Sequence, residues 1–189
     1  AYKEGLYGRR YQWIVSGLYE DKWWQNVHNL DCSKEELMAA LDGYIATDVL
    51  PLTSSQTTDF GLTTYEYEAE YTRMRGSEYS RFHGYAYDGI WAIAFAVRSV
   101  HEKLRSMSSS LTLKDFRYRD TFWAQLFKEA LNETQFNGVT GRVSFDKNER
   151  RGVVLLKQFQ GQKEYKIGEY ITYSDALDFK GAPISWRDI

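Results

Sequence analysis

The chain has 189 residues, 43% of them hydrophobic, which is typical of a soluble globular protein with one medium or two small cores. Its 24 basic and 26 acidic residues leave a formal net charge of -2 without a long basic run, which argues against nucleic-acid binding. The longest apolar segment, GIWAIAFAV at 89–97, is about half as long as a membrane span.

The first fifty residues predict helices alternating with strands. Ser33 and Glu36 match the capping box, in which side chain and backbone bond reciprocally at the start of a helix. The segment YQWIVSGL is rich in β-branched and aromatic residues, as expected of a buried strand. The predicted elements are a helix ending at Gly8, a strand at 11–18, a helix at about 34–42 and a strand at 43–52.

Two helices are predicted in the middle of the chain. The first opens at TTYE, residues 63–66, and ends near Gly76. The second is the strongest pattern in the sequence, and Asp88 is expected in its first turn, where a carboxylate suits the helix dipole. Apolar residues repeat there at intervals of three and four, which predicts one buried face. That expected face comprises Ile90, Ile93, Ala94, Val97, Val100 and Leu104.

Strands dominate the remainder of the chain after a third helix at 121–132. The segments GRVSF and RGVVLLKQF, separated by DKNE, read as strand, turn and strand because Asp and Asn favour tight turns. A second turn at 160–162 precedes the strand YKIGEYITY. The whole order predicts an α/β fold with a sheet flanked by helices.

Few residue patterns point to bound metals or cofactors. His28, His83 and His101 lack metal-site spacing, and no phosphate-binding glycine motif is present, so no cofactor is expected. Cys32 is the single cysteine, so it is either a free thiol or bonded to a residue outside this sequence. The N-terminal segment has neither an initiator Met nor a signal-peptide pattern, so we expect the chain to be part of a longer polypeptide.

The stretch SGLYEDKWW at 16–24 offers two readings. Its tryptophans, Trp23 and Trp24, can stack on a ligand or fill the gap between a sheet and a helix, and the second reading is favoured. Glu20 and Asp21 could serve a glycosidase beside such an aromatic platform, but adjacent carboxylates in a bend seldom converge on one bond. We therefore expect no enzyme.

Three long motifs carry a resemblance to a known family. RYQWIVSGLYEDKWW, SRFHGYAYDGIWAIA and ALNETQFNGVTGRVSFDKNERRG, in this order, closely resemble the extracellular ligand-binding module of metabotropic GABA-B receptors. Within that family the chain is most similar to the type 2 subunit, in an invertebrate-like version. The resemblance extends nearly from end to end.

The resemblance implies a periplasmic-binding-protein type I fold, or Venus flytrap, in which two three-layer α/β/α lobes hold a ligand between them. The chain would form a partial bilobal module, the later half of the ligand-binding region. By resemblance, residues 1 to about 76 belong to the membrane-proximal lobe and about 80–148 to the outer lobe. Residues from about 149 to 189 would supply hinge-crossing strands and the C-terminal end.

Four residues acquire expected roles from the resemblance. The type 1 subunit has a GABA-stacking tryptophan at the position of Leu18, although vertebrate type 2 subunits share that ring. It also has, at the position of Phe82, a glutamate that meets the GABA ammonium. Both departures predict lost agonist contacts. Cys32 is a candidate for a disulfide with a cysteine just before Ala1, and the sequon at Asn132 is a candidate glycosylation site.

The implied function is that of a type 2 subunit at the extracellular side of the plasma membrane. Such a subunit forms a heterodimer with a type 1 subunit, which binds GABA, and it signals to a G protein through a transmembrane region that this chain lacks. The alternative is an agonist-binding type 1-like or divergent amino-acid-receptor subunit. A carbohydrate-active enzyme is a third and weaker reading.

Overall fold

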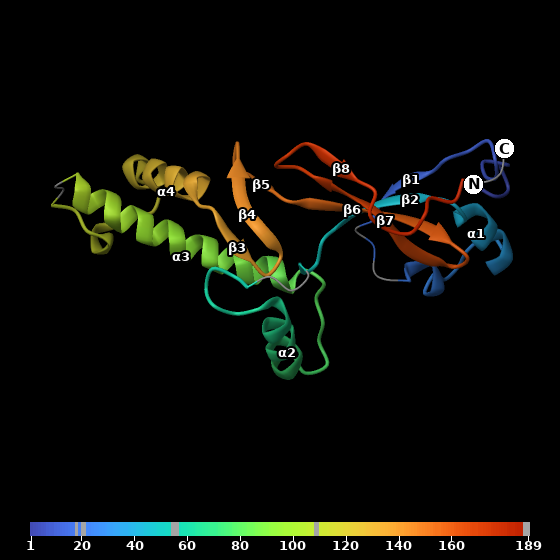
Figure 1. The fold of residues 1–189 in the computed structure, drawn as a ribbon, viewed down its shortest axis with the longest axis horizontal. Coiled ribbons are helices and arrows are strands. Elements are labelled where there is room, and N and C mark those ends of the chain that lie inside the picture. The colour runs from blue at the N-terminus through green and yellow to red at the C-terminus, as the bar shows by residue number, and fades with distance from the viewer. Residues whose placement is uncertain (18, 20–21, 54–56, 108–109, 187–189) are drawn as a thin grey trace. The chain divides into compact units, whose positions relative to one another are not determined.

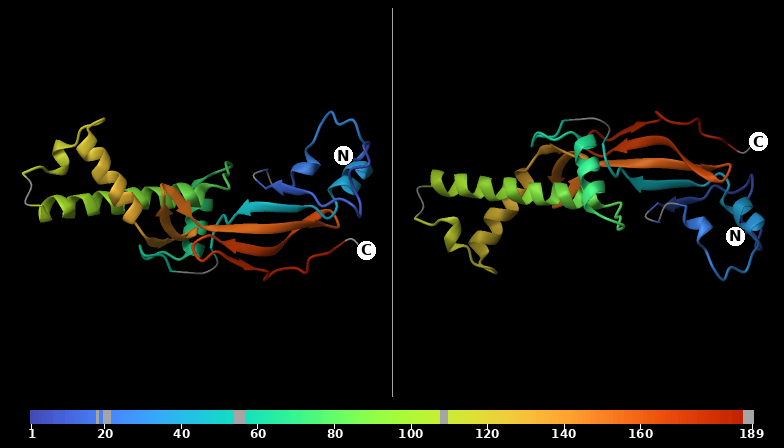
Figure 2. Two further views of the ribbon diagram at one scale, coloured as in Figure 1. Left: turned by 90° about the horizontal axis from the view of Figure 1, so that it is seen from above. Right: turned by 90° about the horizontal axis from the view of Figure 1, so that it is seen from below.

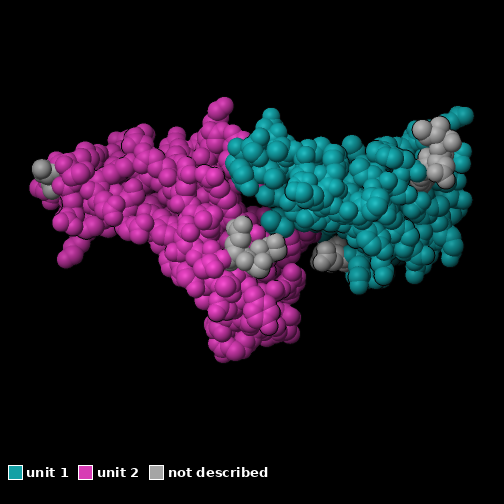
Figure 3. Space-filling model, viewed as in Figure 1, with its two compact units in different colours: residues 1–50, 153–189 teal, residues 51–152 magenta. Residues whose placement is uncertain are grey.

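The computed structural model describes residues 1–17, 19, 22–53, 57–107 and 110–186. The chain forms two compact units. Unit 1 contains residues 1–50 and 153–189, and unit 2 contains residues 51–152, as coloured in Figure 3. Each unit has its own sheet and its own hydrophobic core, and Figure 1 labels their elements.

Unit 1 is built on a five-stranded mixed sheet with the order β1-β2-β6-β7-β8. Strand β1 pairs with β2 in parallel, and the other pairs are antiparallel. The long hairpin of β6 and β7 turns at Gly161 and Gln162, both with positive φ, as the turn predicted at 160–162 requires. The elements are β1 (Ile14–Ser16), a 3₁₀ turn (Trp23–Gln25), α1 (Lys34–Leu41), β2 (Ile45–Val49), β6 (Val153–Gln160), β7 (Lys163–Ile171) and β8 (Ala176–Asp178).

Aromatic rings fill the core of unit 1. Trp24 is buried and meets Phe159 edge to face, with 4.9 Å between ring centroids. Tyr44 stacks on the same phenylalanine at 5.2 Å, and Leu37 of α1 packs against this cluster. The interpretation of the paired tryptophans as core residues is therefore confirmed for Trp24, while Trp23 lies partly buried at the edge of the cluster.

The N-terminal helix expected at 1–8 is not formed. Residues 2–5 make isolated turns, in which the Gly5 N–H donates to the Tyr2 carbonyl at 2.9 Å. Gly5 and Gly8 both have positive φ, and two left-handed residues so close together interrupt a right-handed helix. The short segment is held by other contacts, including Tyr2 stacked on Tyr7.

Unit 2 combines three helices with a three-stranded antiparallel sheet in the order β3-β4-β5. Helix α2 begins in the predicted segment 63–66, where Thr63 and Glu66 form a capping box, and the capping box predicted for α1 is also present. Lys147 and Asn148, both with positive φ, turn the chain between β4 and β5. The elements are α2 (Thr64–Met74), α3 (His83–Ser106), a 3₁₀ turn (Leu113–Asp115), α4 (Thr121–Glu133), β3 (Phe136–Gly138), β4 (Gly141–Asp146) and β5 (Glu149–Arg151).

Helix α3 buries only part of the predicted face: Val100 and Leu104 are buried as expected, but the residues nearer its start are not. Ile90 is 68% exposed and Ile93 is 55% exposed, whereas Ala92 and Ala96 are buried. The buried side continues through Val100 and Leu104 and packs against α4, which lies along the C-terminal half of α3 in both views of Figure 2. Small alanines on this side let neighbouring elements approach the helix closely.

The lobe boundaries expected from the resemblance stay a prediction. Within unit 2, helix α2 packs on the start of α3 through Tyr67 and Tyr71, which stack against His83. The contacts therefore group α2 with α3 in unit 2, which begins at residue 51.

Candidate functional site

Phe82, one of the two predicted ligand positions, lies at the start of α3. It is the N-cap residue, and its ring is 44% exposed. The Arg81 guanidinium lies 5.8 Å from the ring centroid, and the Phe82 N–H donates to the Ser80 hydroxyl at 3.3 Å. The position therefore presents an apolar ring beside a positive charge.

His83 follows directly and is held among tyrosines. Its ring stacks on Tyr71 with 3.8 Å between centroids and an angle of 7°. The Tyr67 hydroxyl lies 2.8 Å from Nδ1 of His83. Burial lowers the pKa of His83 and raises the pKa of Tyr67 to about 12, because a charged form of either group would lose water. Both side chains are therefore neutral near pH 7.

These rings line an open groove between α2 and α3 with a volume of about 970 Å³. Its walls are two helical stripes, one from Tyr67, Tyr71 and Met74 of α2 and the other from His83 and its neighbours on α3. The lining is mainly apolar, as in typical small-molecule sites.

Two carboxylates at the rim of this groove are already bonded. Glu66 closes the capping box by accepting from the Thr63 N–H at 2.8 Å, and that bond lowers the pKa of the carboxyl. Glu70 accepts two bonds from Arg73, which lower its pKa as well. The groove therefore combines aromatic surface with rim charges that have partners.

Asp88 anchors the start of α3 to the loop that joins β3 and β4. It is 1% exposed, and it accepts from the Val139 N–H at Oδ1 and the Thr140 N–H at Oδ2, each at 2.9 Å. The Thr140 hydroxyl donates to the same Oδ2. A Cβ at position 138 would overlap this carboxylate, which explains Gly138. Asp88 lies in the second turn of α3, and its role is this anchor rather than the expected charge on the helix dipole.

Arg150 extends the anchor. Its guanidinium donates to the Thr140 hydroxyl at 2.6 Å and lies 4.7 Å from the centre of the Tyr85 ring. Burial lowers the pKa of Arg150, although the nearby Asp88 charge opposes this effect. The Nε atom of Arg150 is buried without a hydrogen-bond partner. The start of α3 and the adjacent sheet are thus joined by a buried polar chain.

Unit 1 contains a comparable buried network around Lys157. The Lys157 ammonium lies 2.7 Å from Asp48 on β2 and 2.7 Å from Glu164 on β7, so it links three strands. The Tyr44 hydroxyl donates to Glu164 at 2.6 Å. Burial alone would lower the pKa of Lys157, but the two carboxylates outweigh it and raise that pKa.

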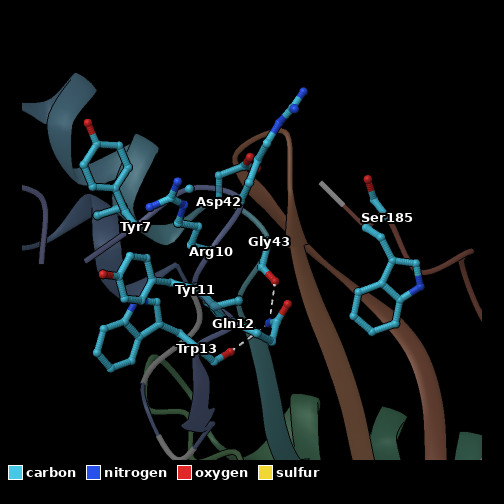
Figure 4. A pocket seen from close by; sticks show the side chains of 13 residues that line it. Tyr7, Arg10, Tyr11, Gln12, Trp13, Asp42, Gly43 and Ser185 are labelled. Carbon is cyan, nitrogen blue, oxygen red and sulfur yellow. Dashed lines mark hydrogen bonds between the residues drawn. The ribbon is translucent and has the colours of Figure 1, made fainter. Parts of the chain in front are cut away.

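A small hollow in unit 1 lies between the segment 7–13, the end of α1 and the C-terminal segment (Figure 4). Its volume of about 260 Å³ is below the usual range for ligand pockets. The Gln12 side chain spans it, donating to the carbonyls of Trp13 and Gly43 at 3.0 Å each. This hollow is the weaker candidate for a ligand site because it is small and the side-chain amide of Gln12 is already hydrogen-bonded to two backbone carbonyls.

Cys32 is a free thiol in the structure and is partly buried. It borders an apolar hollow of about 540 Å³ that is also lined by the first four residues of the chain. Lys3 and Asp31 approach to 3.5 Å across it. The first residues therefore lie on the same hollow as the thiol.

Asn132 lies in the last turn of α4 and is partly buried. The sequon hydroxyl, Thr134 Oγ1, is buried and donates to the Ala130 carbonyl at 2.7 Å. In the folded chain this hydroxyl is therefore already engaged in a hydrogen bond.

Leu18, Glu20 and Asp21 lie outside the described residues, so the second predicted ligand position and the carboxylate pair have no structural account. Among the described residues, no three His, Cys, Asp or Glu side chains are grouped as a metal site requires. Within the same residues, no helix is both long and apolar enough to span a bilayer.

Comparison with known families accounts for most of the chain. The receptor family ligand binding region matches residues 1–158. The chain belongs to this family. The predicted fold class, partial α/β lobes of the periplasmic-binding-protein type I, is thereby confirmed, and the mixed sheet and helices agree with it.

The relatives of this ligand-binding region are GABA-B receptors. It is 44% identical over 184 residues to the human gamma-aminobutyric acid type B receptor subunit 2, covering 94% of this chain and 20% of that protein. It is 31% identical over 187 residues to mouse subunit 1, covering 95% and 19%. For Caenorhabditis elegans subunit 2 the identity is 28% over 176 residues, covering 92% and 18%. These similarities confirm the resemblance found in the sequence motifs.

The ligand-binding region spans about a fifth of the length of these relatives. They are receptors rather than enzymes. The stacking of His83 among Tyr67 and Tyr71, the Asp88 anchor and the Lys157 network were not predicted from the sequence. Their one visible signal was polar or charged residues within apolar segments, such as Asp88 in YAYDGIWAIA.

Proposed function

We propose that the chain is part of the extracellular domain of a GABA-B-type receptor subunit of type 2 that binds no agonist itself. The higher identity to human subunit 2 than to mouse subunit 1, 44% against 31%, supports this assignment. In this proposal the chain lies at the extracellular side of the plasma membrane, where such a region meets its ligands.

The observation that carries the proposal is the chemistry at Phe82. An ammonium group that leaves water needs a carboxylate or several acceptors to compensate its lost hydration. Phe82 offers neither, and the neighbouring Arg81 guanidinium adds a positive charge. The groove beside it supplies no unengaged carboxylate, because Glu66 and Glu70 already have partners.

In the proposed mechanism, the chain contributes interface energy and a type 1 subunit binds GABA. Agonist binding shifts the partner from open to closed states, because the ligand has a higher affinity for the closed state. The type 2 subunit stabilises the active pair and passes the change to a G protein through a transmembrane region. The expected partners are therefore a type 1 subunit and, indirectly, a G protein.

A type 1-like or divergent amino-acid-receptor subunit is the second candidate. The groove of about 970 Å³ beside Phe82 favours it, because the paired rings of His83 and Tyr67 place polar atoms next to aromatic surface. An amino-acid-like ligand would then be held by residues other than a carboxylate at position 82.

Calorimetric titration of the complete ectodomain with GABA, without a partner, distinguishes the two candidates. The type 2 proposal expects no heat of binding from this subunit and a clear signal from its complex with a type 1 subunit. Micromolar binding to the isolated subunit would overturn it. Replacing Phe82 and His83 by Ala in the complete receptor should leave agonist potency within about threefold, whereas a loss of tenfold or more with intact assembly favours the second candidate.

We also propose that Asn132 carries a glycan. Because the Thr134 hydroxyl donates to the Ala130 carbonyl in the folded chain, the glycan must be transferred to Asn132 before the last turn of α4 forms. Enzymatic deglycosylation of the secreted ectodomain should convert Asn132 to Asp in its peptide mass. An unmodified Asn132 in that material would contradict the assignment.

A further inference from the structure

A short basic segment precedes α4 in unit 2. Its sequence at 114–119 is KDFRYR, which places Lys114, Arg117 and Arg119 against one acidic residue in a chain whose formal net charge is -2. All of these residues are exposed, and they lie between the end of α3 and the start of α4 (Figure 1). We call residues 114–119 the basic segment.

The two carboxylates closest to these cations in the sequence are already bonded to the backbone. Asp115 accepts from the Thr112 N–H at 2.8 Å and caps the 3₁₀ turn. Asp120 caps α4 by accepting from two N–H groups of its first turn. Within the described residues, none of the three basic side chains of the segment forms an ion pair. These cations are therefore available to anionic groups of a ligand.

An exposed aromatic ring stands among the charges. Tyr118 lies between the two arginines and is 89% exposed. Its ring meets the Phe116 ring with 5.0 Å between centroids. Phe116 in turn packs edge to face on Trp123 and Phe127 of α4, at 5.7 and 5.5 Å. The packing of Phe116 thus fixes the segment on α4 and leaves the Tyr118 ring open to solvent.

The chemistry of this surface fits a sulfated polysaccharide. A guanidinium group binds oxyanions such as phosphate in a bidentate manner, and sulfate has the same tetrahedral arrangement of oxygens. An exposed aromatic ring offers a flat apolar face to the C–H groups of a sugar. Short segments rich in Lys and Arg are typical of heparin-binding patches. A protein partner would instead need an apolar interface core, whereas Phe116 is already packed on α4.

We propose that the basic segment binds a sulfated polysaccharide, with Arg117 and Arg119 paired to sulfate groups and Tyr118 packed on a sugar ring. This inference rests on the extracellular location in the proposed function, because anionic lipids concentrate in the cytoplasmic leaflet and sulfated polysaccharides supply the polyanions outside the cell. It does not depend on which subunit binds GABA. The calorimetric titration of the ectodomain with GABA and the binding of a polysaccharide therefore test the two proposals separately.

Retention of the complete ectodomain on immobilised heparin tests the proposal. The double variant Arg117→Gln, Arg119→Gln should weaken heparin binding at least about tenfold at physiological ionic strength, because it removes both guanidinium groups. The matched control is Arg9→Gln, Arg10→Gln, which removes the same charge from another exposed site and should weaken binding less than about twofold. Equal losses in the two variants, or no retention of the parent protein, would overturn the proposal.

Two further measurements separate a polysaccharide from other anions. Tyr118→Ala keeps every charge and should still weaken heparin binding about threefold, because the sugar loses its aromatic contact. Desulfated heparin should compete at least about tenfold less well than heparin, because the arginines lose their sulfate partners. Phosphatidylserine vesicles or polyglutamate that bound to the basic segment as tightly as heparin would overturn the assignment to a sulfated polysaccharide.

Discussion

Replacing Asp88 by Asn tests whether the buried anchor at the start of α3 works as its geometry indicates. Both carboxylate oxygens accept hydrogen bonds, one from the Val139 N–H and the other from the N–H and hydroxyl of Thr140. An Asn side chain keeps one acceptor and places an NH₂ donor where the other oxygen was. In either orientation a backbone N–H then faces another donor.

The cost of Asp88→Asn follows from these contacts. A hydrogen bond to a charged group contributes about 1.5–3 kcal/mol, and a buried N–H left without an acceptor costs a further 1–3 kcal/mol or so. The sum is about 2.5–6 kcal/mol, a large part of the 5–15 kcal/mol or so that stabilises a typical domain. At roughly 4 °C or more per kcal/mol for a unit of about 100 residues, the melting temperature should fall by at least about 10 °C.

Thermal unfolding of the complete ectodomain, followed by circular dichroism, measures this shift. The matched control is Asp31→Asn, since the Asp31 side chain is fully exposed, and it should move the melting temperature by less than about 2 °C. Thr140→Val removes the hydroxyl bonds to Asp88 and from Arg150 but keeps the backbone bonds to Asp88, and its melting temperature should fall between the two. A melting temperature for Asp88→Asn within about 2 °C of the parent would refute the anchor.

Three further outcomes are expected, two from the structure and one, the disulfide, from the family resemblance. Lys157→Met leaves the buried carboxylate of Asp48 and the partly buried one of Glu164 without their cation, and it should destabilise unit 1 by about 1–3 kcal/mol in denaturant titrations. Lys166→Met, at an exposed pair, should change little. Burial lowers the pKa of His83, so the contribution of this side chain to stability is complete above pH ~6.5 and is lost as pH falls through the folded-state pKa. His83→Phe should therefore flatten the dependence of stability on pH. An unchanged pH profile would contradict this assignment. Non-reducing peptide mapping of the secreted ectodomain should find Cys32 in a disulfide with a cysteine just before Ala1, and a freely alkylated Cys32 would rule that pairing out.

Local signals in the sequence predicted much of the secondary structure. The capping box at Ser33 begins α1 as expected, and α2 begins in the expected segment at Thr63, because such helix starts depend on hydrogen bonds between residues only three apart. The turn at 147–148 forms within the predicted DKNE segment, because the preference of Asp and Asn for tight turns is also local. The expected N-terminal helix is not formed because Gly5, within the segment, adopts a positive φ that interrupts a helix, whereas a glycine at position 8 alone is compatible with a helix end.

Tertiary contacts explain what the sequence could not predict. The apolar periodicity of α3 fits two faces of the helix. The large residues Ile90 and Ile93 favour one face, whereas the structure buries the other face through the small residues Ala92 and Ala96. The Asp88 anchor joins residues 51 and 52 positions apart, so no local pattern reveals it. The same holds for the link between Lys157 and Asp48, which depends on strand pairing.

Phe82 connects the proposed loss of agonist binding with the packing of α3. A glutamate at this position would need a cation or water beside it, and the Arg81 guanidinium lies 5.8 Å from the centroid of the Phe82 ring. A phenyl ring needs neither, and it begins an apolar stripe that continues through Ile90 and Ile93. Under the proposed assignment, one side chain thus offers no acceptor to an ammonium group and adds apolar surface to this helix face. In the proposed subunit, the missing ammonium contact and the apolar start of α3 are consequences of the same residue.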